Sequence, residues 1–79
     1  MSSVEWARQG DQLVGVVTKR DFASAMAFVN RVAVVAETAG HHPDIDIRWN
    51  QVTLRLWTHT EGTVTDADLD LAKKIDDVV

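Results

Sequence analysis

The sequence predicts an α+β fold in which a four-stranded antiparallel sheet carries two helices on one face, in the order strand, strand, helix, strand, strand, helix. Segments of strand-forming composition occur in pairs that are joined by short turns. Each pair is followed by a segment whose apolar residues have helical spacing. Because hairpins join antiparallel strands, the sheet is expected to be antiparallel, with the helices packed together on it.

The first pair of strands flanks the turn dipeptide Gly10-Asp11. Residues 4–9 and 12–18 each carry β-branched or aromatic residues that favour strands. Around Gly15 the second segment is apolar at both odd and even positions, so its alternation does not assign its two faces. We expect a hairpin here.

A long helix is predicted over residues 21–39. Asp21 is a favourable N-cap, and Gly40 followed by Pro43 is typical of a helix end. The apolar residues with helical spacing are Phe22, Ala25, Met26, Val29, Val32, Ala33 and Ala36. A second apolar stripe comprises Ala27, Phe28, Val34 and Val35. Two interpretations stay open for this stripe, a broad contact within the chain or a contact with a helix of another subunit.

Two further strands and a second helix follow Pro43. Apolar and polar residues alternate from Ile45 to Trp49 and again from Val52 to Thr58, with Asn50-Gln51 as the expected turn. After a loop, Thr65 begins the last helix. The apolar face of that helix is expected to comprise Leu69, Ala72, Ile75 and Val79.

Composition limits the classes of function. The 79 residues are expected to form a single domain over 1–79, small enough that we expect a homodimer or homotetramer. The sequence has no cysteine, so disulfides and thiolate metal sites are excluded. Its net charge of −4 does not favour direct binding to nucleic acid. With no signal-like segment and no long apolar run, we expect a cytoplasmic protein that does not bind membranes.

The stretch Glu37-Thr38-Ala39-Gly40-His41-His42-Pro43 places three titratable side chains where a helix ends. The unpaired carbonyls of a helix C-terminus carry partial negative charge, which favours the protonated form of His41 and His42. Glu37 precedes His41 by one turn and can add negative charge or orient a ring. Taken alone, such a histidine pair is more often a solvated helix end than a catalytic site.

Further motifs occur along the chain at fixed distances from this stretch: Trp49, Asn50-x-Val52, Thr58-His59, Thr65-x-x-Asp68 and Leu71-Ala72. Together with Glu37-x-x-x-His41-His42-Pro43 they resemble the signature of the pterin-4a-carbinolamine dehydratases, also called 4a-hydroxytetrahydrobiopterin dehydratases. The resemblance extends to Trp6, Phe22 and Phe28 and covers nearly the whole chain. It implies the α+β fold described above, dimers or tetramers, no metal and no bound cofactor.

The resemblance also implies a reaction. A hydro-lyase of this family removes water from a 4a-hydroxytetrahydropterin to give a quinonoid dihydropterin, which supports recycling of the tetrahydrobiopterin used by aromatic amino-acid hydroxylases. Carried over to this sequence, His41 and His59 are the expected acid and base, His42 holds the pterin, and Glu37 orients a histidine. Proton transfer of this kind is what paired histidines supply near neutral pH.

The remaining expected site residues line the substrate pocket or support it. By resemblance, the substrate-binding residues are Pro43, Trp57, Thr58, Thr60 and Glu61. Asp68 matches an acidic position of the family, yet its spacing from Thr65 also fits a capping box, so we expect it mainly to cap the last helix. Zinc binding by three histidines and a glutamate is disfavoured, because adjacent histidines lack the usual ligand spacing.

Three departures from the family pattern keep a second function open. The chain lacks the N-terminal, often helical segment of most members, Gly40 stands where Asp or Asn is common, and Trp57 replaces a small residue. The bulk of Trp57 either narrows the pocket or stacks on a bicyclic ring. The alternative to an enzyme is a dehydratase-like binding protein, acting as an assembly factor for ribulose-bisphosphate carboxylase or as a dimerisation cofactor. The retained histidines favour the enzyme.

Overall fold

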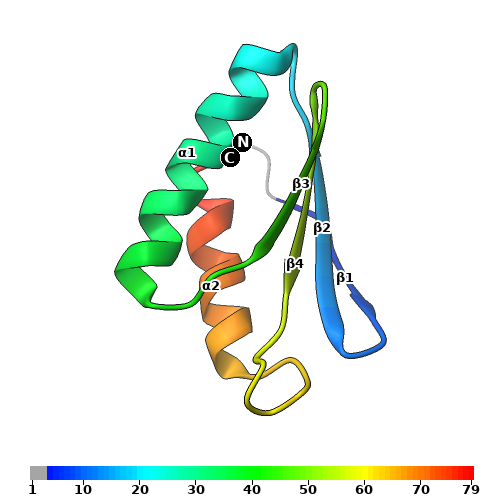
Figure 1. Cartoon of the computed structure of the whole chain (residues 1–79), viewed down its shortest axis with the longest axis vertical. Coiled ribbons are helices and arrows are strands. Elements are labelled where there is room, and N and C mark those ends of the chain that lie inside the picture. The colour runs from blue at the N-terminus through cyan, green and yellow to red at the C-terminus, as the bar shows by residue number, and fades with distance from the viewer. Residues whose placement is uncertain (1–3) are drawn as a thin grey trace.

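Two helices lie on one face of a four-stranded antiparallel sheet in the computed structural model, which describes residues 4–79 (Figure 1). The elements follow the predicted order and confirm the predicted fold class. They are β1 (Trp6–Gln9), β2 (Gln12–Thr18), α1 (Phe22–Ala39), β3 (Asp44–Arg48), β4 (Gln51–Leu56) and α2 (Asp66–Asp76).

The sheet has the strand order β1-β2-β4-β3, so β4 lies inside it and β3 forms an edge. Alternation along β4 buries Val52, Leu54 and Leu56 completely against the helices. In the register, Ile45 is opposite Leu54 and Asp44 is opposite Arg55. The start of β3 therefore lies beside the end of β4, and this is where the candidate site is found.

Gly15 settles the face assignment that the sequence left open in β2. It pairs with Trp6, and a Cβ atom added at Gly15 would lie 2.5 Å from Val4 Cγ1 and 2.8 Å from the Trp6 ring. The absence of a side chain lets Trp6 pack on the helix side of the sheet. There, the Trp6 indole and the Val4 amide both donate to Asp76 Oδ1, at 3.2 and 2.9 Å. Gly15 thus joins the first strand to the end of α2.

Helix α1 begins and ends where the sequence predicts. The Asp21 carboxylate accepts a hydrogen bond from the Ser24 amide at 2.8 Å, and Gly40 closes the helix at φ +67°. Its buried residues are Ala25, Phe28, Val32 and Ala36. The predicted core face was therefore partly wrong, because Phe28 is fully buried while Phe22 is 51% exposed. A helix with two apolar stripes leaves the choice of face to its tertiary contacts.

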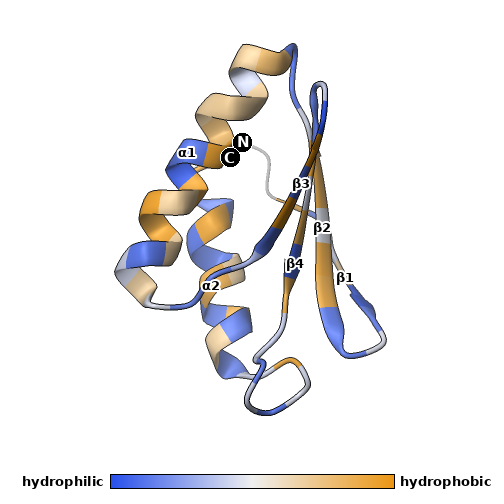
Figure 2. Cartoon of the chain, viewed as in Figure 1, coloured by the Kyte–Doolittle hydropathy of each residue, from blue (hydrophilic) through white to orange (hydrophobic). Residues whose placement is uncertain are grey.

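By length and composition alone, α1 is also apolar enough to cross a membrane, with a mean hydropathy of 1.2 over 18 residues. Figure 2 shows apolar residues along most of this helix. The core helix of a water-soluble domain has the same composition, and α1 packs through Phe28 and Val32 into the core beneath the sheet. The composition of this helix is therefore weak evidence for a membrane span.

The turn between β3 and β4 lies one residue earlier than predicted. Trp49 and Asn50 form it, and Trp49 adopts a left-handed conformation with φ +54°. Asn50 secures the turn against the β2–α1 connection, because its side-chain amide donates to the Lys19 carbonyl at 2.9 Å and its own carbonyl accepts from the Lys19 amide at 2.8 Å. This long-range contact decides the position of the turn.

Helix α2 begins after Thr65 as predicted, but its buried face differs from the predicted one. Leu69 is 46% exposed and does not belong to it. The buried residues are Asp68, Leu71, Ala72 and Ile75. A carboxylate thus occupies a core position, which apolar periodicity alone does not predict.

Candidate active site

A cavity of about 270 Å³ lies between the end of α1 and the residues that follow β4. The two segments meet there because β3, which continues from the α1 connection, pairs with β4. The lining residues are Gly40, His41, His42, Trp57, Thr58, His59 and Thr60. All three histidines of the sequence therefore contribute to one cavity.

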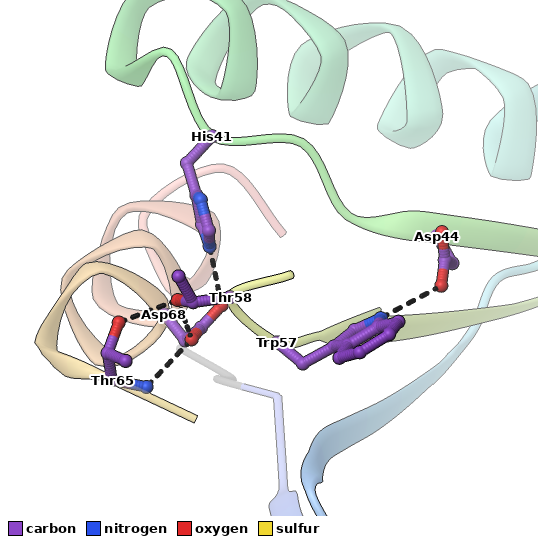
Figure 3. Close-up of polar contacts among 6 residues, drawn as sticks. All are labelled: His41, Asp44, Trp57, Thr58, Thr65 and Asp68. Carbon is purple, nitrogen blue, oxygen red and sulfur yellow. Dashed lines mark hydrogen bonds and ion pairs between the residues drawn. The ribbon is translucent and has the colours of Figure 1, made fainter. Parts of the chain in front are cut away.

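The helix end sets the direction of the histidine pair. Gly40 takes the left-handed conformation, and the His41 amide donates to the Ala36 carbonyl at 3.1 Å. This closure ends α1 and turns the chain toward α2. His41 consequently points at α2 rather than along the axis of its own helix (Figure 3).

His41 meets the buried carboxylate of Asp68. The distance from His41 Nε2 to Asp68 Oδ1 is 2.5 Å, and the side chains are 20% and 0% exposed (Figure 3). The second carboxylate oxygen accepts from the Thr58 hydroxyl at 2.7 Å and from the Thr65 amide at 2.8 Å. The hydroxyls of Thr58 and Thr65 lie 2.6 Å apart. The Asp68 carboxylate thus has hydrogen-bond partners at the N-terminus of α2, in the segment after β4 and at the end of α1.

Two opposing effects act on the pKa of Asp68. Burial raises it, but the hydrogen bonds from His41, from the Thr65 amide and from the Thr58 hydroxyl outweigh burial and hold the pKa below the ordinary value of 3.8. Asp68 is therefore a carboxylate at neutral pH and accepts the Nε2 proton of His41. Because this bond occupies Nε2, Nδ1 is the nitrogen of His41 that can exchange a proton with a ligand.

His42 has a different carboxylate partner. Its Nε2 atom lies 3.1 Å from Glu37 Oε1, and the two side chains are 63% and 74% exposed. Such an exposed pair contributes little to stability, although it restricts the orientation of the ring. Glu37 had been expected one turn before His41. The structure pairs it with His42, because α1 closes at Gly40 and His41 turns toward Asp68.

His59 lies on the opposite wall, against an indole. The ring centroids of Trp57 and His59 are 4.1 Å apart, with 33° between the ring planes. The indole nitrogen of Trp57 donates to Asp44 Oδ2 at 3.4 Å (Figure 3). Trp57 is half-buried, whereas His59 is exposed.

The family model described as "Pterin 4 alpha carbinolamine dehydratase" matches residues 1–78. The chain belongs to this family. A relative from Nocardia farcinica named "Putative pterin-4-alpha-carbinolamine dehydratase" is 51% identical over 74 residues, which are 94% of this chain and 78% of the relative. A protein of the same name from Thermomicrobium roseum is 56% identical over 70 residues, 89% of this chain and 75% of the relative.

Solved structures agree with the family assignment. A structure described as a transcriptional coactivator/pterin dehydratase from Brucella melitensis has a TM-score of 0.87 and 29% identity, and the match covers 92% of this chain and 80% of that one. A pterin dehydratase-like protein described as a RuBisCO assembly factor of the alpha-carboxysome has a TM-score of 0.76 and 22% identity, covering 98% and 89%. The second likeness shows a shared fold alone.

Only some of the pocket residues expected from the family line the cavity. Trp57, Thr58 and Thr60 line the cavity, whereas Pro43 and Glu61 are not among its lining residues. Sequence reasoning assigned Asp68 mainly to the helix cap and did not predict its contact with His41. Sequence reasoning also missed Asp44. No local motif marks this residue, because only the register of β3 against β4 brings residue 44 toward Trp57.

Across residues 4–79, no group of three or more His, Cys, Asp or Glu side chains is arranged to hold a metal ion. His41 and His42 are directed to separate carboxylates. The three histidines of the cavity are therefore arranged in two histidine–carboxylate pairs and one histidine–indole pair, which suits proton transfer to and from a flat ligand.

Proposed function

We propose that this protein is a hydro-lyase that dehydrates a 4a-hydroxytetrahydropterin to quinonoid dihydropterin and water, as a step in the recycling of tetrahydrobiopterin. The observation that carries the proposal is the convergence of His41, His42 and His59 on one cavity, with His41 hydrogen-bonded to a buried carboxylate. Membership of the dehydratase family supports the same reaction. The substrate class is a small-molecule pterin.

The chemistry requires two proton transfers. The C4a–O bond breaks and the hydroxyl leaves as water after it takes a proton from an acid. The N5–H proton passes to a base, and a C4a–N5 double bond forms. His41 and His59 supply this acid–base pair, and a correctly placed pair of this kind typically accelerates a reaction by about 10²–10⁴-fold. No electrons are transferred to or from the pterin, so the step needs no redox cofactor.

Of the other site residues, His42 binds the ligand. His42, oriented by Glu37, contacts the pterin, and Thr58, Thr60 and Trp57 line the cavity beside it. A volume of about 270 Å³ is near the lower end of the range for small-molecule sites and suits a bicyclic ring. Pro43 and Glu61 have no part in this proposal because they do not line the cavity.

We place the protein in the cytoplasm as a homodimer or homotetramer. The apolar surface that α1 leaves uncovered supports the assembly, since Val34 is 67% exposed on that helix. The absence of cysteine agrees with a reducing compartment.

The competing function is a binding protein without catalysis, for example an assembly factor for ribulose-bisphosphate carboxylase. The solved structure described as a RuBisCO assembly factor is 22% identical to this chain, so this likeness shows a shared fold alone. A docking surface needs neither the His41–Asp68 pair nor a histidine on the facing wall. These features favour the enzyme.

A pterin-dehydration assay tests the proposal. The purified wild type is expected to exceed the spontaneous rate, and His41→Ala and His59→Ala are each expected to lower kcat by about 10²-fold or more, because each removes one proton carrier. Arg48→Ala is a matched control, since Arg48 is exposed and lies at the other end of β3. Circular dichroism verifies the fold of every variant. A wild type that adds nothing to the spontaneous rate rules the enzyme out.

A further inference from the structure

The three histidines of the cavity are not restrained equally. His41 and His42 each have a carboxylate partner, whereas the His59 ring makes no hydrogen bond within residues 4–79. His59 is also exposed. An exposed side chain without a polar partner samples several rotamers, and an acid or base that does so spends little time in reacting geometry. Some other contact is needed to hold this ring.

Backbone geometry brings Trp57 to His59. Trp57 follows the end of β4, and His59, two residues further on, lies in the turn that follows Thr58. The turn is closed by the Glu61 amide, which donates to the Thr58 carbonyl at 3.0 Å, and by an isolated antiparallel bridge in which the Thr58 amide donates to the Thr63 carbonyl at 2.9 Å. The indole and imidazole therefore lie 4.1 Å apart between centroids, tilted by 33°.

Trp57 is itself anchored. Its indole nitrogen donates to Asp44 Oδ2 at 3.4 Å, and Asp44 is held in β3 opposite Arg55 (Figure 3). The contacts run without interruption from the edge strand through Asp44 and Trp57 to His59. Each side chain in this series restricts the next.

The geometry points to Trp57 as a positioning residue for His59: the indole, tethered by Asp44, holds the imidazole at the wall of the cavity. This inference rests on the proposed function and adds to it the contact that orients His59, one of the two residues proposed to transfer protons. An aromatic pair gains energy beyond the area it buries, so the indole is able to favour one imidazole rotamer.

The competing account has the indole stack on the bicyclic ligand. One face of the indole is already covered by His59. A ligand that stacked on this face would have to displace the imidazole on which the reaction depends. The two accounts differ in kinetics, because loss of a stacking surface raises KM, whereas loss of orientation lowers kcat.

NMR of the three histidines tests the positioning without a need for activity. At a fixed pH, the Cε1 proton of His59, assigned with His59→Gln, is expected upfield in the wild type because the imidazole ring packs against the indole. Trp57→Ala should move it downfield to the position of an exposed histidine, and Trp57→Phe should keep part of the upfield shift. Asp44→Ala should weaken the shift, whereas Asp44→Asn, which keeps an oxygen acceptor, should preserve it.

Kinetics provide the second readout. Trp57→Ala is expected to lower kcat about threefold to tenfold, the size of one aromatic contact, with KM nearly unchanged. Trp57→Phe should recover most of kcat. Trp49→Ala is the matched control, since Trp49 is 66% exposed in the β3–β4 turn, and it should leave both the His59 signal and kcat unchanged.

An unchanged His59 resonance in Trp57→Ala overturns the inference, and so does a raised KM with an unaltered kcat. The failure of the proposed function is a separate result. If the wild type has no dehydratase activity, the reaction is wrong, yet the NMR comparison of Trp57→Ala with Trp49→Ala still decides whether the indole holds His59.

Discussion

At the scale of single residues, Asp68 connects the fold to the site. Its carboxylate receives the Thr65 amide as part of the helix N-terminus and the His41 ring from the end of α1. A buried carboxylate is tolerated only when its oxygens have hydrogen-bond partners, and both oxygens of Asp68 have them. Removing the charge therefore affects stability and His41 together.

The lowered pKa of Asp68 makes the free energy of unfolding depend on pH in the acidic range. Because the folded-state pKa lies below the ordinary 3.8, the ionised group stabilises the fold above that pH, and this contribution is lost as pH falls through 3.8 toward the folded-state value. Asp68→Asn should cost about 2–3 kcal/mol at neutral pH, since it weakens charge-assisted hydrogen bonds. It should also flatten the fall in unfolding free energy as the pH falls through 3.8.

Urea unfolding at a series of pH values measures this difference. Asp70→Asn serves as the control, because Asp70 is exposed on the same helix. If Asp68→Asn and the wild type lose stability in parallel as pH falls, Asp68 is not the source of the acid dependence.

At the scale of elements, Gly15 controls how the β1–β2 hairpin joins the helices. Gly15→Ala should lower the unfolding free energy by about 1–3 kcal/mol, the usual cost of overpacking. The new Cβ would lie 2.5 Å from Val4 Cγ1 and 2.8 Å from the Trp6 ring, and both groups belong to the segment tied to Asp76. Denaturant unfolding measures the loss.

Val16→Ala is the matched control, because Val16 is the next residue of β2 and is 48% exposed. Its effect should be much smaller. Equal losses for Gly15→Ala and Val16→Ala would show that the Trp6 contact does not depend on the missing side chain.

Local signals in the sequence located the elements well. Gly10-Asp11 placed the first turn, Asp21 and Gly40 bounded α1, and Thr65 began α2. Each of these signals acts through backbone conformation or a cap within a few residues, so it can be read without the tertiary structure. The family motif similarly identified the three histidines of the cavity.

Features that depend on distant contacts were not predictable. Phe22 and Leu69 were expected on buried faces but are exposed, because more than one set of apolar residues fits the helical period and only packing selects one. The His41–Asp68 contact joins residues 27 apart in the sequence, and the Trp57–Asp44 bond needs the register of β3 against β4. No local pattern encodes these distances.

At the scale of the whole molecule, α1 faces both the core and the surface. For the second apolar stripe of α1, a contact within the chain and a subunit contact were both open, and Phe28, its largest member, is fully buried in the core. Val34 remains 67% exposed, beside a groove of about 340 Å³ between the helices that is also lined by Val35 and Val78. The proposed oligomer would use this part of α1, where apolar surface is still uncovered.

Val34→Glu tests that contact. A buried, unpaired carboxylate at an interface is costly, so the variant is expected to have a smaller mass by light scattering than the wild type. Gln9→Glu is the control for added charge, because Gln9 is exposed on β1. The wild type should also show a Tm that rises with protein concentration, as an associating protein does, whereas the Tm of Val34→Glu should not. Equal masses, together with a wild-type Tm that is independent of concentration, would show that α1 makes no subunit contact and that the exposed valine belongs to the surface of a monomer.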